Sequence, residues 1–67
     1  MIQKAFINPK MMKWAREYAG FVGGYEEELP KQIRDKYESW ESGEKVPSWN
    51  QLYDVSKKFN VPTAFFS

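Results

Sequence analysis

The fold is decided by residues 37–62, which read YESWESGEKVPSWNQLYDVSKKFNVP. Tyr37 and Trp40 stand three positions apart, so they share one face of a helix. Gly43 interrupts this helix, because glycine readily adopts the left-handed conformation in which helices commonly end. Pro47 precedes a second helical run. Because proline is not tolerated in a helix interior, we expect this second helix to begin at or after Pro47. The stretch therefore predicts two helices joined by a tight turn.

The second of these helices has clear start and stop signals. Ser48 and Gln51 have the S-x-x-Q spacing of a capping box, in which each side chain bonds the backbone N–H of the other residue. Asn60 is suited to a left-handed stop, and Pro62 can begin a last short turn over residues 63–66. The buried face of the helix is predicted to consist of Leu52, Val55, Ser56 and Phe59.

Upstream of the turn, residues 31–41 have one helical face. Ile33, Tyr37 and Trp40 lie at positions i, i+4 and i+7, which is the spacing of a single buried stripe. We expect this segment to be helical, with the two aromatic rings in the core. The arrangement from Leu29 to Val61 is interpreted as two short helices, a tight turn at residues 41–44 and then the capped helix. Trp49 directly follows a helix cap and is expected to be partly exposed.

Residues 21–30 leave two structures open. A short helix could begin near Tyr25 and tolerate Pro30 in its first turns, or an irregular acidic loop could precede one helix that starts at Pro30. Three consecutive carboxylates, Glu26–Glu28, point in different directions and lack the spacing of a metal loop. We interpret them as a solvated charge run.

The first helix is predicted over Pro9–Ala19. Asn8 is a good N-cap, proline suits the first helical position, and Gly20 is a natural stop. Trp14 is expected in the core. The apolar stripe is predicted to consist of Met11, Trp14 or Ala15, and Tyr18.

Composition limits what the chain can do. It has 67 residues, no His, no Cys and a formal net charge of +1, which excludes disulfides, thiolate or imidazole metal sites and His-dependent nucleophiles. We expect no enzyme activity, no cofactor and no bound metal. No apolar run approaches the ~20 residues that span a bilayer, so we expect a cytoplasmic protein without a membrane partner. The predicted fold is a single all-α domain over residues 1–67, a compact bundle of four to five short helices.

Two sets of residues resemble known families. The pattern Tyr37-x-x-Trp40-Glu41-x-Gly43-x-x-x-Pro47, followed by Leu52-x-x-Val55-Ser56-x-x-Phe59-x-Val61-Pro62, resembles the phage repressor/Cro-type, or XRE-like, helix-turn-helix family. The opening Ile7-Asn8-Pro9-x-Met11-x-x-Trp14-Ala15-Arg16-Glu17 and the ending Val61-Pro62-x-Ala64-Phe65-Phe66 are similar to the module that precedes ImmA/IrrE-type metallopeptidase domains. The second resemblance would make the chain the N-terminal piece of a longer protein, and Phe65 and Phe66 would pack either on a missing neighbour or on the chain's own core.

The resemblance implies a repressor-like domain of a transcriptional regulator that binds duplex DNA sequence-specifically. Its recognition helix would lie around residues 34–41 and enter the major groove. Arg34 could pair with guanine, Ser48 opens a helix whose N–H groups match phosphate positions, and Lys31 and Gln32 are weaker candidates. The implied DNA-binding residues are Arg34, Asp35, Lys36, Ser39, Lys45 and Ser48.

The charge balance of the predicted DNA-binding segment indicates that a single copy of the chain binds DNA weakly. The basic residues of segment 31–47 are balanced by an equal number of acidic ones, and phosphate contacts dominate affinity for DNA. We expect an isolated monomer to bind near the non-specific range of ~10⁻⁴–10⁻⁶ M. A homodimer or a C-terminal domain outside this chain would be needed for tight binding. The alternative hypothesis is a degenerate helix-turn-helix fold that binds protein. It is based on the neutral recognition segment, the acidic run Glu26–Glu28 and the Gly-Gly and Pro interruptions. An exposed apolar patch around Trp49, Phe65 and Phe66 would support it.

Overall fold

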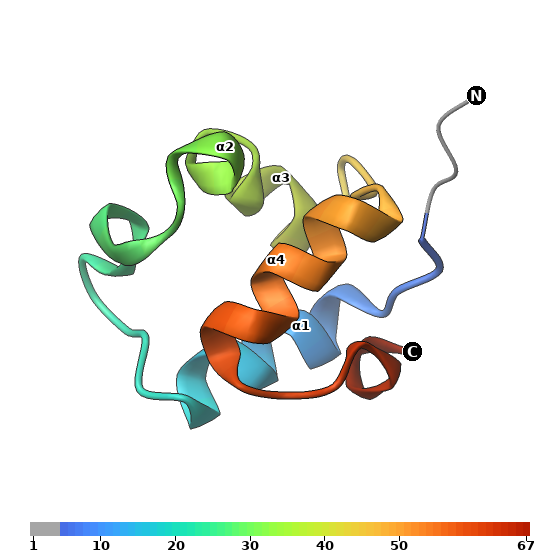
Figure 1. Cartoon of the computed structure of the whole chain (residues 1–67), viewed down its shortest axis with the longest axis horizontal. Coiled ribbons are helices and arrows are strands. Elements are labelled where there is room, and N and C mark those ends of the chain that lie inside the picture. The colour runs from blue at the N-terminus through green and yellow to red at the C-terminus, as the bar shows by residue number, and fades with distance from the viewer. Residues whose placement is uncertain (1–4) are drawn as a thin grey trace.

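The chain folds into an all-α bundle. The computed structural model describes residues 5–67, so residues 1–4 of the predicted domain lie outside it. Within the described residues there are four α-helices, two 3₁₀ turns and no extended strand (Figure 1). In chain order the elements are α1 (Pro9–Tyr18), η1 (Tyr25–Glu28), α2 (Lys31–Arg34), α3 (Tyr37–Glu41), α4 (Trp49–Phe59) and η2 (Thr63–Phe66). The predicted fold class, a compact bundle of four to five short helices, is confirmed.

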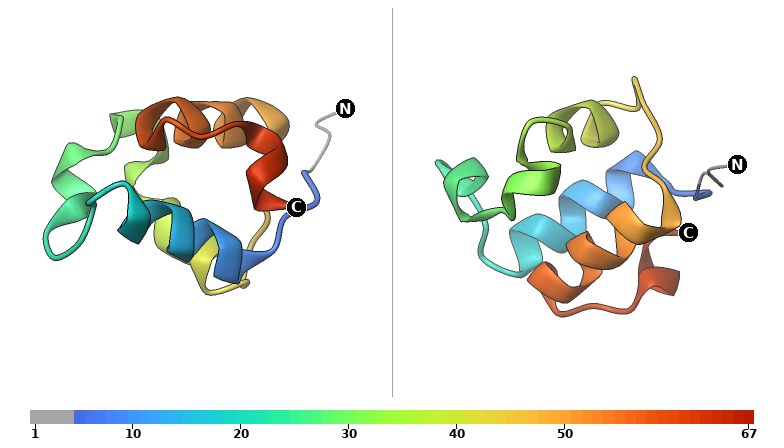
Figure 2. Two further views of the ribbon diagram at one scale, coloured as in Figure 1. Left: turned by 90° about the horizontal axis from the view of Figure 1, so that it is seen from below. Right: turned by 45° about the horizontal axis from the view of Figure 1, so that its top comes forward.

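The two longest helices enclose the core from opposite sides. Figure 2 (left) shows α4 along one side of the molecule and α1 along the other, with η1 at the far end. The η2 turn folds back onto the start of α1, where the Asn8 N–H donates to the Phe66 carbonyl at 2.7 Å. Helix α3 packs against α1. No helix among residues 5–67 has the length and apolar character needed to cross a bilayer.

The core is built around aromatic rings. Tyr37 packs edge-on against Trp40 and Phe59, with ring centroids 6.1 and 5.9 Å apart. The predicted face of residues 31–41 and the predicted inward face of α4 are both confirmed, because all their members are buried. The buried hydrophobic residues are Ala5, Met12, Ala15, Leu29, Ile33, Tyr37, Trp40, Leu52, Val55, Phe59 and Phe66.

Helix α4 begins and ends as the sequence predicts. The Ser48 hydroxyl accepts from the Gln51 N–H at 3.2 Å, and the Gln51 side-chain oxygen accepts from the Ser48 N–H at 2.8 Å. Asn60 caps the other end with a left-handed φ of 58°. These local bonds fix the start of α4 without help from the rest of the chain.

The predicted buried stripe of α1 is right at Ala15 but wrong at Trp14 and Tyr18. The residues that face the core are Met12, Ala15 and Arg16, whereas Trp14 and Tyr18 are 51% and 75% exposed. Arg16 shares the inward side of the helix with Met12 and Ala15. It and its ion-pair partner Glu41 are largely shielded from solvent, so a charged residue lies on the side that faces the core. The helix itself ends at Tyr18, one residue before the predicted end.

Residues 31–41 form two short helices, as predicted, and the break between them lies at residues 35 and 36. Asp35 and Lys36 separate α2 from α3 although both stay in the right-handed region, with φ of −74° and −102°. Hydrogen bonds across the joint tighten to i−3, from the Ser39 N–H to the Lys36 carbonyl at 3.1 Å. The Ser39 hydroxyl donates to the same carbonyl at 2.6 Å. The Lys36 carbonyl therefore has two donors from Ser39, and these local bonds compete with the regular i−4 hydrogen bonds of a continuous α-helix.

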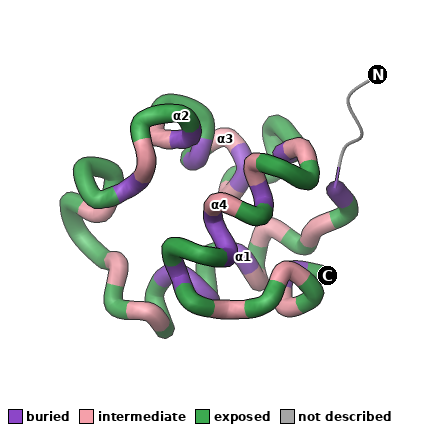
Figure 3. The backbone as a smooth tube through the Cα atoms, viewed as in Figure 1, coloured by how far each residue is buried: buried purple, intermediate pink, exposed green. Residues whose placement is uncertain are grey.

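Residues 21–30 combine parts of both predicted structures. A 3₁₀ turn begins at Tyr25, as the first alternative has it, but Leu29 is extended and α2 begins directly after Pro30, as in the second. Glu26–Glu28 are exposed, as a solvated charge run requires. Figure 3 shows that the segment leading to this turn lies mostly at the surface.

The two C-terminal phenylalanines have different surroundings. Phe66 is fully buried and closes the core, whereas Phe65 is half-buried and stacks on Trp14 at 5.3 Å between centroids. Trp49 is 45% exposed, as predicted. The patch around Trp49, Phe65 and Phe66 that would support protein binding is not formed, because Phe66 is buried.

Candidate nucleic-acid interface

An open groove collects most of the sequence-predicted DNA-binding residues. It has a volume of about 1020 Å³ and lies between α3, the loop that follows it, the start of α4 and the first described residues. Five of the six predicted residues line this groove, and Arg34 does not. The five are Asp35, Lys36, Ser39, Lys45 and Ser48.

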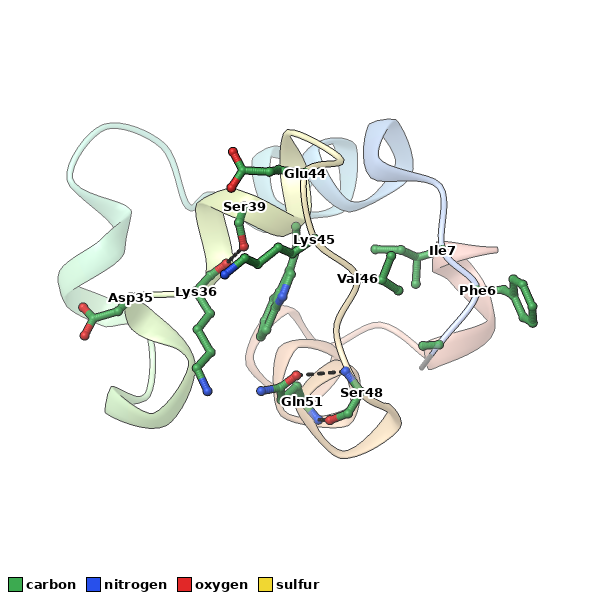
Figure 4. A pocket seen from close by; sticks show the side chains of 12 residues that line it. Phe6, Ile7, Asp35, Lys36, Ser39, Glu44, Lys45, Val46, Ser48 and Gln51 are labelled. Atoms are coloured by element: carbon green, nitrogen blue, oxygen red, sulfur yellow. Dashed lines mark hydrogen bonds between the residues drawn. The ribbon is translucent and has the colours of Figure 1, made fainter. Parts of the chain in front are cut away.

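The side chains of Lys36 and Lys45 extend over the groove, and the carboxylates of Asp35 and Glu44 point away from it (Figure 4). Among residues 5–67 the single ion pair lies elsewhere, so neither lysine is neutralised. The formal charges of the lining cancel, but their positions favour a negatively charged group in the groove.

The loop after α3 holds Lys45 in place. Gly43 adopts a left-handed φ of 82°, which ends α3 and is accessible to glycine without steric cost. The Lys45 N–H then donates to the Ser39 carbonyl at 3.0 Å. This bond ties the loop to α3, which begins directly after Lys36, so backbone contacts fix the positions from which the two lysine side chains extend.

Ser48 contributes the start of α4 to the groove. Its hydroxyl oxygen accepts the Gln51 N–H, which leaves the hydroxyl proton available as a donor. The N-terminus of an α-helix also carries a partial positive charge. The cap and the two lysines thus present positive potential from two sides of the same groove.

Arg34 is held by the backbone of its own segment. Its guanidinium donates to the Leu29 carbonyl from Nε at 3.3 Å and from Nη2 at 2.9 Å, and to the Glu27 carbonyl at 3.2 Å. These bonds close the turn between η1 and α2. In this position Arg34 stabilises the local fold and does not reach the groove.

Sequence reasoning missed the residues that complete the lining. Glu44 and Gln51 contribute polar side chains, and Ile7 contributes an apolar wall next to Trp40. Glu44 directly precedes Lys45 in the turn, so the presence of a carboxylate beside that lysine could have been inferred from the sequence. The approach of Ile7 could not, because it depends on the Ala5 N–H donating to the Pro47 carbonyl at 2.9 Å across the fold.

An ion pair with little solvent exposure anchors α3, the helix that contributes Ser39 and Trp40 to the groove lining. Arg16 Nε donates to Glu41 Oε2 at 2.5 Å and Nη2 donates to Oε1 at 3.2 Å, while Nη1 donates to the Phe21 carbonyl at 2.6 Å. The guanidinium also lies over the Tyr25 ring, 4.1 Å from its centroid. The hydrogen bond with Glu41 raises the pKa of Arg16. One side chain therefore joins α1, the loop after it, η1 and α3.

Tyr37 lies beside this pair and is expected to make stability depend on alkaline pH. Its hydroxyl is buried near Glu41 but has no hydrogen-bond partner of acceptable geometry. Burial, with a further contribution from Glu41, raises the pKa of Tyr37 far above its usual value, and burial also raises that of Tyr25. The folded state keeps protons that the unfolded state loses above about pH 10. Stability is therefore complete below that pH and falls above it.

The variant Tyr37→Phe tests this effect. We expect a smaller loss of stability above pH 10, because the remaining dependence comes from Tyr25. At neutral pH the free energy of unfolding should stay the same or rise by up to about 1 kcal/mol, since an unpaired buried hydroxyl is removed. Urea unfolding at neutral pH and above pH 10 measures the free energy of unfolding under the two conditions. Tyr53→Phe, which changes an exposed tyrosine, is the control. An unchanged alkaline loss in Tyr37→Phe would contradict the assignment.

Comparison of the chain with models of protein families, with curated proteins and with solved structures finds no match.

Proposed function

We propose that the chain is a sequence-specific duplex-DNA-binding domain of a transcriptional regulator, of the repressor-like helix-turn-helix type. The observation that carries the proposal is the convergence of Lys36, Lys45 and the capped start of α4 on one groove. Phosphate groups are recognised by this combination of lysines and helix N-terminal N–H groups. The helical segment that contains Lys36 and Ser39 would face the major groove.

The structure changes which residues we expect to read bases. Arg34 keeps a structural role in this proposal, since its guanidinium already binds two backbone carbonyls. Asp35 and Ser39 line the groove. Their side chains are of the types that form hydrogen bonds with the edges of bases. Asp35 could accept from cytosine, and Ser39 could approach either a base or the backbone. Lys36 and Lys45 would supply most of the affinity through phosphates.

A double variant tests the proposal. Lys36→Ala/Lys45→Ala is expected to weaken binding to duplex DNA and to lower the slope of log affinity against log salt by about 2, because each lysine that contacts a phosphate contributes about 1. Fluorescence anisotropy with random-sequence duplex DNA over a range of salt concentrations measures both. In the unsubstituted chain, adding duplex DNA should shift the NMR signals of Lys36, Ser39 and Lys45, and adding salt should reverse these shifts.

The control removes the same charge elsewhere. Lys57→Ala/Lys58→Ala lies in the last turn of α4, away from the groove lining, and lowers the net charge by the same amount. This variant should lower the salt slope much less than the groove variant. Equal losses in the two variants would indicate a diffuse charge effect, and no binding at low salt would exclude the domain as a DNA reader.

A second candidate function, protein binding, has support on another face of the molecule. There, two aromatic side chains of α1 are exposed instead of being buried.

A further inference from the structure

Three aromatic rings form a stack on the outside of α1. Tyr18 and Trp14 are parallel within 9°, with centroids 5.0 Å apart, and Phe65 from η2 stacks on the same indole at 5.3 Å. Trp14 and Tyr18 remain 51% and 75% exposed. None of the three lines the groove. Contiguous apolar surface of this kind in a soluble protein commonly marks an interaction site.

Contacts within the chain hold the stack together. Trp14 contacts both other rings, and Phe65 is anchored through Phe66, whose carbonyl accepts the Asn8 N–H and whose ring is fully buried. Tyr18 is the most exposed of the three, so its ring is open to apolar side chains of a partner.

The surface beside the stack is positive at one end. Lys10 and Lys13 are exposed in the first half of α1, whose first turn contains no acidic residue. The partial positive charge of the helix N-terminus adds to them. Among residues 5–67 neither lysine has an ion-pair partner. Glu17 is exposed towards the opposite end of α1, so this face is positive near the start of the helix and negative near its end.

The size of the face indicates a peptide and not a second copy of the chain. An aromatic side chain buries ~150–250 Å² when covered, so the exposed parts of the three rings offer on the order of 350 Å², against ~800 Å² per partner in a standard interface. A dimer built on this face alone would be unstable. A short segment that needs a few apolar anchors and an electrostatic contact matches the area and the charge.

We propose that the face formed by Trp14, Tyr18 and Phe65 binds an acidic amphipathic peptide segment of a partner protein. The apolar side chains of the segment lie over the rings, and its carboxylates lie beside Lys10 and Lys13. The proposal does not rest on DNA binding, because the face and the groove share no residue.

The test uses a synthetic helical peptide with leucine and phenylalanine on one face and aspartate and glutamate on the other. Added to the ¹⁵N-labelled chain, it should cause saturable NMR shifts at Trp14, Tyr18 and Phe65, including the Trp14 indole N–H. Tyr18→Ser should weaken binding about tenfold, as expected for loss of an aromatic anchor. Lys10→Glu/Lys13→Glu should weaken it by a similar factor.

Matched controls separate this face from the general properties of the chain. Tyr53→Ser removes a tyrosine that is 56% exposed on α4, and Lys57→Glu/Lys58→Glu reverses the same number of charges. Neither should change peptide affinity. A peptide with glutamine at every acidic position should bind much more weakly.

Several outcomes would overturn the proposal. They are shifts centred on Lys36 and Lys45, equal affinity for the acidic and glutamine peptides, equal losses in Tyr18→Ser and Tyr53→Ser, or no shifts at all. Concentration-dependent shifts of Trp14 and Tyr18 in the free chain would also overturn it, because they would identify a second copy as the occupant.

Discussion

Replacing Glu41 with alanine is expected to unfold most of the domain at room temperature. The change leaves the Arg16 guanidinium without its carboxylate at a position where its side chain is 10% exposed. Removing one partner of a buried ion pair costs about 3–5 kcal/mol. A helical domain of this size rarely has more than about 3–5 kcal/mol of stability, so the loss is comparable with the whole. Circular dichroism and urea unfolding measure it.

Two variants distinguish a buried charge from a general effect at α3. Glu38→Ala removes an exposed carboxylate from the same helix and should change stability by less than about 0.5 kcal/mol. The double variant Arg16→Met/Glu41→Leu removes both charges and should recover much of the loss, because apolar replacements of a buried pair are often neutral or stabilising. A Glu41→Ala protein as stable as Glu38→Ala would show that the pair is not buried in solution.

Phe66→Ala is expected to have the second largest effect. The ring is fully buried and closes the core where η2 meets α1. Truncating a buried phenylalanine costs about 3–5 kcal/mol, through lost apolar transfer and the cavity left behind. The start of α1 should also lose hydrogen-exchange protection, because the Phe66 carbonyl accepts the Asn8 N–H. Urea unfolding with amide exchange measures both.

The neighbouring residue provides the matched control for this prediction. Phe65→Ala removes the same side chain one position earlier, where the ring is half-buried against Trp14. Its cost should be about 1 kcal/mol, as for a surface aromatic pair. Similar losses from Phe65→Ala and Phe66→Ala would contradict the burial of Phe66 and the partition of the two rings between core and surface.

The candidate site was predictable in part. A helix, a glycine turn and a capped helix can each be predicted from local sequence. Together they give the positions of Lys36, Ser39, Lys45 and Ser48. Their convergence on one groove was an implication of the family resemblance, and the structure brings these residues together. The role of Arg34 was not predictable, because a guanidinium takes whatever carbonyls the fold leaves within reach. Here those belong to Glu27 and Leu29.

By itself the sequence determined the elements that depend on neighbours in the chain. The capping box at Ser48, the left-handed stop at Asn60 and the glycine turn after α3 need only bonds that span a few residues. Only the tertiary structure decided which side of α1 faces inward and where residues 31–41 break. Helix α1 carries apolar residues on two sides, Met12 with Ala15 and Trp14 with Tyr18, and the buried side is the one that meets the rest of the folded chain. The Arg16–Glu41 pair lies on that side, and its partners are 25 residues apart and meet only after the chain has folded.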